Sequence, residues 1–256
     1  MKEMRLVEKV LGNHDFVEIR PISDTHIGDP LFDDLLLQQE IDWVLAEDFR
    51  YLVLNGDIMN MATKHSVSNS YDSVMTPHEE LKYARTLFKR ARKKILGVTA
   101  GNHEDRILKN DGIDIAEELA ISLGTSYCRE GLLLKIKFGK RKTNSKPQVY
   151  TFYMTHGFTG SRTVGGKANR LEKLRKIVVS DVYIVSHSHQ KVFFKKKLFI
   201  PDLRNNKITE KIQTFINTGA YLRYGKYGQR KSYDPTDLGT LTIRLYAKEK
   251  NITVTG

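Results

Sequence analysis

The first half of the chain alternates short apolar runs with amphipathic helical patterns. The apolar runs typical of buried strands are Phe16–Ser23, Tyr51–Asn55 and Ile95–Ala100. Helices are predicted over Asp33–Phe49, from Thr76 onward and over Ile113–Leu123. Their apolar stripes are Leu37, Ile41, Val44 and Leu45 in the first helix, and Leu81, Ala84, Phe88, Ala91 and Ile95 in the second. This alternation of strand and helix is typical of an α/β fold.

The second half of the chain is richer in strands. Predicted strands are Leu132–Phe138, Val149–Met154, Val182–Val185, Ile212–Asn217 and Leu241–Tyr246. One basic helix is predicted over Lys167–Val178, and the run Lys195–Lys197 is interpreted as a solvated hairpin turn. The sequence has no internal repeat and no linker rich in proline or serine. We therefore expect a single α/β domain over residues 1–256, with strands sandwiched by helices.

Histidine, aspartate and asparagine cluster directly after the predicted strands. The clusters are Asp24-Thr25-His26, Gly56-Asp57, Gly101-Asn102-His103-Glu104, His156-Gly157 and His187-Ser188-His189. Loops at strand ends are where α/β proteins bind their ligands. Asp24 and His26 are two residues apart, so on an extended segment their side chains would point the same way, and His187 and His189 repeat this spacing.

Imidazole, carboxylate and amide groups together are ligands for Mn²⁺, Fe or Zn²⁺ rather than Ca²⁺. Seven such groups are too many for one ion, and they suit two ions about 3.5–4 Å apart that share a carboxylate. Each motif alone is weakly specific. Gly12-Asn13-His14-Asp15 matches one of them, but it precedes Asp24 and consists of turn-forming residues, so we interpret it as a structural turn.

The ordered series D-x-H, G-D, G-N-H-E, H-G, H-x-H resembles the pattern of the calcineurin-like metallophosphoesterase superfamily, and the match runs from Asp24 to His189. The resemblance implies a four-layer α/β/β/α sandwich of two mixed sheets flanked by helices. One departure is Ser186, which stands where the family usually has glycine before the last motif. A backbone that required positive φ at this position would be strained by serine.

The resemblance also implies the roles of individual residues. Asp24, His26, Asp57 and His189 would hold one divalent metal ion, and Asp57, Asn102, His156 and His187 would hold the second. Asp57 would bridge the two, and a metal-bridging hydroxide would be the nucleophile. His103 would be the general acid at the leaving group rather than a ligand. Glu104 would not bind a metal ion itself but would contact the residues that do. Mn²⁺ is the expected metal, with Fe or Zn²⁺ as alternatives.

Charge is distributed unevenly along the chain. Residues 1–128 hold 15 Lys and Arg against 22 Asp and Glu, a net charge of −7, whereas residues 129–256 hold 27 against 8, a net charge of +19. This asymmetry favours nucleic acid as a partner, although a basic surface that serves solubility would look the same. The single cysteine excludes an internal disulfide, and no apolar run reaches the length of a membrane span. We therefore expect a cytoplasmic protein, with its oligomeric state left open.

The substrate is constrained by residues around the metal motifs. The stretch Gly56–Ala62 lacks the Asp-Arg-Gly of the family's protein phosphatases, and Asn60 gives it the G-D-x-x-N of many nuclease, phosphodiesterase and small-phosphatase members. We expect phosphodiester hydrolysis on nucleic acid. Two alternatives stay open: a phosphomonoesterase that uses the same centre, and a nucleic-acid-binding protein with a vestigial site. Candidate substrate contacts are Arg106, Arg162, Tyr221 and Arg223.

Overall fold

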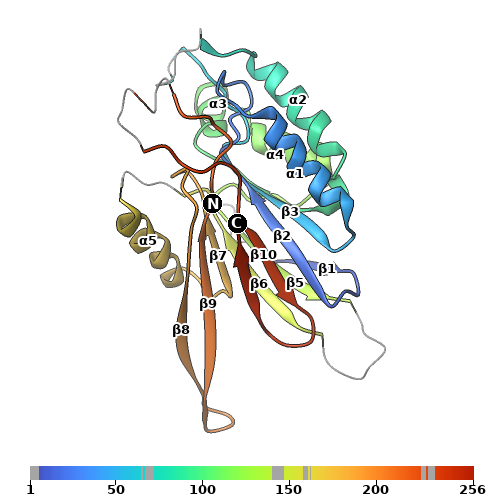
Figure 1. The fold of residues 1–256 in the computed structure, drawn as a ribbon, viewed down its shortest axis with the longest axis vertical. Helices are drawn as coiled ribbons and strands as arrows, with labels where there is room; N and C mark the ends of the chain where they lie inside the picture. The colour runs from blue at the N-terminus through green and yellow to red at the C-terminus, as the bar shows by residue number, and fades with distance from the viewer. Residues whose placement is uncertain are drawn as a thin grey trace.

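A computed structural model describes residues 6–64, 66, 72–139, 147–157, 161, 163–225, 229 and 234–256. Two mixed sheets lie face to face between layers of helices (Figure 1). The six-stranded sheet has the order β1 (Leu6–Leu11), β5 (Leu132–Phe138), β6 (Val149–Met154), β7 (Val182–Val185), β9 (Lys207–Asn217) and β8 (Val192–Asp202). The five-stranded sheet has the order β11 (Ile252–Thr255), β10 (Thr242–Tyr246), β2 (Phe16–Ile22), β3 (Arg50–Asn55) and β4 (Ile95–Thr99).

Three hydrophobic clusters fill the interfaces between four layers. Within β3, Leu52 and Leu54 face the helices while Val53 faces the other sheet, as the two-residue period of a strand requires. A third cluster joins Leu171 of helix α5 (Val164–Glu172) to Tyr183 and Phe215 of the six-stranded sheet. The α/β/β/α sandwich predicted from the sequence is confirmed by these layers.

The helices begin at polar residues that cap them. Helix α1 (Asp34–Ala46) starts after Asp33, whose carboxylate accepts from the backbone amide of Leu36. Helix α2 (Pro77–Lys89) has the reciprocal capping box of Thr76 and Glu79. The remaining helical segments are η2 (Arg92–Lys94), α3 (Glu104–Asp111), α4 (Ile115–Leu123) and η3 (Lys173–Lys176).

Several predicted details are wrong. Helix α2 ends at Lys89, and Ile95 begins β4 instead of continuing the helical stripe. Leu45 is 42% exposed rather than buried. The run Lys195–Lys197 is not a turn: it lies in the middle of β8, which forms a long hairpin with β9 (Figure 1). β8 is the edge strand of its sheet and pairs with β9 alone, so these lysines are exposed without being in a turn.

The strands that precede the polar clusters end at one edge of the sandwich. β2, β3 and β4 are mutually parallel, and so are β6, β7 and β9. The loops after five of these strands carry the clusters predicted above, so both sheets contribute to one site. No helix in the described part of the chain is both long and apolar enough to cross a membrane.

Candidate metal centre

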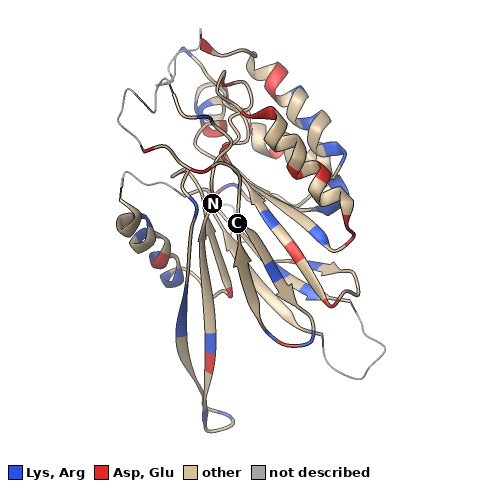
Figure 2. Cartoon of the chain, in the orientation of Figure 1, with Lys and Arg blue, Asp and Glu red and all other residues tan. Residues whose placement is uncertain are grey.

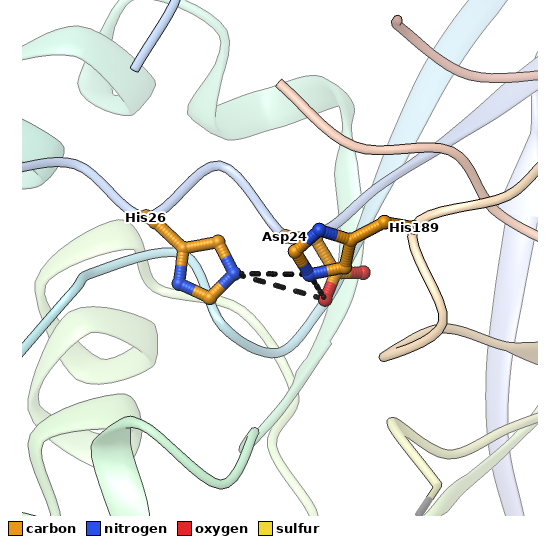
Figure 3. Close-up of side chains that lie close together, drawn as sticks. All are labelled: Asp24, His26 and His189. Atoms are coloured by element: carbon orange, nitrogen blue, oxygen red, sulfur yellow. Dashed lines mark hydrogen bonds and ion pairs between the residues drawn. The ribbon is translucent and has the colours of Figure 1, made fainter. Parts of the chain in front are cut away.

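Asp24, His26 and His189 form the first group of candidate ligands (Figure 3). The Nε2 atom of His189 lies 3.2 Å from Oδ1 of Asp24 and 3.3 Å from Nε2 of His26. The Nε2 atom of His26 lies 4.0 Å from the same carboxylate oxygen. Asp24 and His26 follow β2, whereas His189 enters from the loop after β7, so residues far apart in the sequence meet here.

Asp57, His156 and His187 form the second group, and their potential ligand atoms all lie within 4.8 Å of one another. The Nε2 atom of His156 lies 3.1 Å from Oδ2 of Asp57 and 3.9 Å from Oδ1 of Asp24. His156 therefore stands between the two carboxylates, and the two groups are adjacent. Six of the seven residues named from the sequence as ligands belong to these two groups, and Asn102 directly precedes His103, whose backbone amide donates to Oδ1 of Asp57.

Three buried polar atoms of these residues form no hydrogen bond, although two of them lie 3.1–3.2 Å from another candidate ligand atom. They are Oδ1 of Asp24, Oδ1 of Asn102 and Nε2 of His156. Burying a polar atom without a partner costs free energy, and native proteins rarely leave such atoms unsatisfied. Three of them within the candidate ligand set indicate that the site is built for a bound group that supplies the missing partner.

The backbone conformation at these residues is unusual. Asp24, His26, Asp57, His187 and His189 all have positive φ, between 48° and 69°. Such conformations cost free energy for residues other than glycine and are found at functional sites. The extended geometry expected for the D-x-H and H-x-H spacings is therefore wrong. His187 and His189 instead belong to different ligand groups.

The two carboxylates concentrate negative charge in a buried site. Burial opposes ionisation, but His189 and His156 outweigh it and lower the pKa of Asp24 to about 2. Burial would likewise lower the pKa of His156, but Asp57 and Asp24 raise it to about 10. Burial and the neighbouring His103 hold the pKa of His26 well below its usual value. The site thus binds positive charge, here as protons on imidazoles.

Glu104 fixes the loops that carry Asp57 and Asn102. Its carboxylate accepts hydrogen bonds from the backbone amides of Asp57 (3.0 Å), Met59 (3.0 Å) and Gly101 (2.9 Å). Gly101 has no room for a side chain, because a Cβ there would lie 2.1 Å from Oδ1 of Asp57. These contacts give Glu104 and Gly101 of the G-N-H-E motif a definite structural role.

His103 forms a third group of potential ligand atoms with His26 and Asp57, and both of its ring nitrogens are also in hydrogen bonds. Its Nδ1 is 2.7 Å from the carbonyl oxygen of Asn60, and its Nε2 is 2.9 Å from Nη2 of Arg106. A guanidinium and a metal cation would compete for the same nitrogen, which disfavours His103 as a ligand. Burial lowers the pKa of His103, Asp57 opposes this, and Arg106 lowers it further.

Ser186 does not strain the turn before the last motif. Its φ is not positive, and its buried hydroxyl accepts a hydrogen bond from the side-chain amide of Asn55 at 2.6 Å. The backbone carbonyl of Asn55 in turn contacts Nδ1 of His156 at 2.8 Å. Sequence reasoning missed Asn55, although a polar residue at the end of a buried apolar strand was the available signal.

The expected substrate contacts have different outcomes. Tyr221 is fully buried in the helix-side core, so its prediction as a base-stacking residue is wrong. Its backbone amide donates to the carbonyl of Asp24, which explains why a buried residue follows β9 here. Arg223 forms an ion pair with Asp33 at 3.0 Å, and Arg162 lies outside the described residues. Of the four, Arg106 alone has its side chain shown in contact with a side chain of the site, His103.

No family model matches this chain, and no curated protein matches it either. Similar solved structures include the Pseudomonas putida nuclease MPE, with 12% identity, 93% of this chain and 87% of that chain covered, and a TM-score of 0.38. A metallophosphoesterase from Sphaerobacter thermophilus has 14% identity, the same coverage and a TM-score of 0.40. Vps29 from Chaetomium thermophilum has 11% identity, 93% and 94% coverage, and a TM-score of 0.42.

Proposed function

We propose that this chain is a metal-dependent phosphoester hydrolase that holds two divalent cations. The observation that carries the proposal is the pair of adjacent Asp/His groups at the strand ends, with ligand atoms left unpartnered in a buried site. Buried polar atoms normally form hydrogen bonds, whereas here Asp24 Oδ1 and His156 Nε2 approach only other candidate ligand atoms, without forming one, and Asn102 Oδ1 has no hydrogen bond either.

The residues fit divalent cations in chemistry and spacing. In the first group, the donor atoms are 3.2 to 4.0 Å apart, as expected for ligands that each lie roughly 2.0–2.2 Å from one shared ion. Asp24, His26 and His189 would hold one ion, and Asp57, Asn102, His156 and His187 the other. The shared role of Asp57 follows from the family resemblance. Mixed imidazole and carboxylate ligands suit Mn²⁺, which we propose, and also Fe or Zn²⁺.

The cations, when bound, would activate a water molecule and neutralise charge on the phosphate. The chain's own contribution is positional. Glu104 holds the backbone of Asp57 in place, and the Asn55 carbonyl fixes the ring of His156. Arg106 and His103 lie together beside Asp57, so they present a cation and an imidazole next to the ligands. We propose that His103 acts at the leaving-group oxygen and Arg106 at the phosphate.

The proposed substrate is a nucleic acid phosphodiester. Its support is the net charge of +19 on residues 129–256 and the Lys and Arg side chains on α5 and β8 (Figure 2). A basic surface attracts the phosphate backbone and makes binding depend on salt. Phosphomonoester hydrolysis is the outcome that would contradict the diester part of this proposal.

One assay tests the proposal. With Mn²⁺, we expect hydrolysis of bis(4-nitrophenyl) phosphate and of single- or double-stranded DNA, and much slower hydrolysis of 4-nitrophenyl phosphate. Asp57→Asn should lose metal and activity while keeping its fold, because asparagine tolerates positive φ. The matched control is Asp15→Asn in the second G-N-H-acid motif, which lies in the turn between β1 and β2. Equal activity in the two variants would contradict the proposed centre.

A further inference from the structure

A cavity of about 290 Å³ lies between α5 and the six-stranded sheet. Its apolar lining comes from Tyr153 at the end of β6, Val185 at the end of β7, and Leu171 and Leu174 on the helix side. Ile177, which is 57% exposed, stands among the lining residues where the helix ends. Pockets for small molecules begin at roughly 300 Å³, so this one has room for a single small ring-bearing group.

The cavity shares its wall with the candidate metal centre. Gly157, which directly follows His156, lines it, and so does Ser188, which lies between His187 and His189. The Nζ atom of Lys167 on α5 lies 3.4 Å from the carbonyl oxygen of Ser188. The cavity is therefore lined by residues that directly follow or precede three candidate ligands in the sequence: His156, His187 and His189.

The cavity combines this apolar lining with two cations. Lys167 and Arg170 both line it from α5. Lys167 donates to the Ser188 carbonyl and to Oε1 of Gln190 at 2.8 Å, and an ammonium group has a third proton to donate. One acid, Glu130, also lines the cavity with its side chain 88% exposed, whereas residues 164–176 contain five Lys and Arg against one acid, Glu172. A ligand that fits has an apolar ring and a negative charge beside it.

We propose that this cavity binds a nucleoside of the phosphodiester substrate, namely the one that stays attached to the phosphate after hydrolysis. Lys167 and Arg170 would face that phosphate. This inference rests on the proposed function, because the hydrolysis at the metal centre determines how the substrate is oriented. A nucleoside ring packed between Leu174, Val185 and Tyr153 would strengthen the binding of nucleotide esters. Simple alkyl esters have no such ring and would lack this binding energy.

Two substrates with the same leaving group test this assignment. Thymidine 5′-(4-nitrophenyl) phosphate and methyl 4-nitrophenyl phosphate both release 4-nitrophenolate, so the ratio of their kcat/KM values reports the group that stays. Ile177→Trp places a large ring in the cavity mouth, and this ratio should fall roughly tenfold. Val179→Trp is the matched control, because Val179 is 54% exposed, nearby and outside the lining, and its ratio should equal that of the unmodified protein.

A binding measurement separates this inference from the proposed hydrolysis. Thymidine 5′-monophosphate is titrated into metal-free protein, and Ile177→Trp and Arg170→Met should each weaken its binding several-fold. Val179→Trp and Lys173→Met, at exposed positions outside the lining, should not. If neither ester is cleaved, the proposed function fails, and the titration still decides the cavity. Equal ratios, or equal nucleotide binding, in Ile177→Trp and Val179→Trp would overturn the cavity assignment.

Discussion

The side-chain amide of Asn55 donates a hydrogen bond to the hydroxyl of Ser186, with 2.6 Å between the two atoms. The bond joins the end of β3 to the end of β7, and therefore one sheet to the other beside the metal centre. The same amide also donates to the carbonyl of Thr155 at 3.0 Å, and its oxygen accepts from Thr99 at 2.8 Å. Asn55 is thus fully engaged, and Ser186 supplies one of its partners.

Ser186→Ala should destabilise the protein by about 1–3 kcal/mol, because it leaves a buried amide proton of Asn55 without an acceptor. The measurement is denaturant unfolding of the metal-free protein. Ser180→Ala is the control: Ser180 is also fully buried, but its hydroxyl has no hydrogen-bond partner in the described structure, so its loss should cost little. The same loss of stability in both variants would show that the Asn55 bond contributes nothing.

The site's residues could be predicted because each motif follows a strand. Apolar runs such as Tyr51–Asn55 mark strands by local pattern, and the parallel strands bring the polar residues after them to one edge. Hydrogen bonds across the fold leave no such local signal. The contact between Asn55 and Ser186 joins residues 131 positions apart, so single-sequence reasoning could not find it.

The failed predictions also have physical causes. Lys195, Lys196 and Lys197 interact with residues distant in sequence: the carbonyl of Ile252, Glu172 and Glu210. Their strand therefore lacks the alternating apolar pattern on which strand prediction depends. Tyr221, expected to contact substrate, instead has its ring in the core, and its backbone amide donates to the carbonyl of Asp24. The composition of a loop does not show which of its side chains will be buried.

His103→Gln should slow hydrolysis according to the leaving group. If His103 protonates the departing oxygen, its loss should lower rates with alkyl diesters roughly 100-fold or more, whereas 4-nitrophenyl esters, which leave without a proton, should change less than roughly tenfold. Metal content, measured by elemental analysis, should stay constant, because both ring nitrogens of His103 are already in contact with Asn60 and Arg106, although the ring lies next to His26 and Asp57. Equal slowing with both ester types would remove His103 from the proton transfer.

Metal binding should release protons at pH 8. The carboxylates of Asp57 and Asp24 raise the pKa of His156 to about 10 against the effect of burial, so this imidazole is protonated at pH 8 without metal. Asp24 also raises the pKa of His189 against burial. A cation must displace the proton on His156, so roughly one proton should appear on binding. Titration calorimetry with Mn²⁺ in two buffers of different ionisation enthalpy measures the number. Binding heats that do not depend on the buffer would contradict the charge state inferred here.

Glu80 should make the protein less stable as pH rises through neutrality. The residue is fully buried, and its carboxyl accepts from the backbone amide of Met61 at 2.7 Å. Burial raises its pKa from 4.5 to about 8. Between these two values the folded protein binds more protons than the unfolded chain, so the free energy of unfolding falls as pH rises, by at most about 1.4 kcal/mol for each pH unit. This contribution is complete below pH 4.5 and is lost above pH 8.

Glu80→Gln tests this linkage because glutamine stays neutral and keeps an oxygen for the Met61 amide. The variant should gain stability relative to the unmodified protein as pH is raised from about 5 to about 8, since only the unmodified protein must ionise a buried group. Denaturant unfolding at several pH values, with a chelator present so that metal occupancy does not vary, gives the comparison. Glu249→Gln, at an exposed position, is the control and should leave the pH dependence unchanged. A stability difference between Glu80→Gln and the unmodified protein that stays constant over this range would show that Glu80 is already ionised at pH 5.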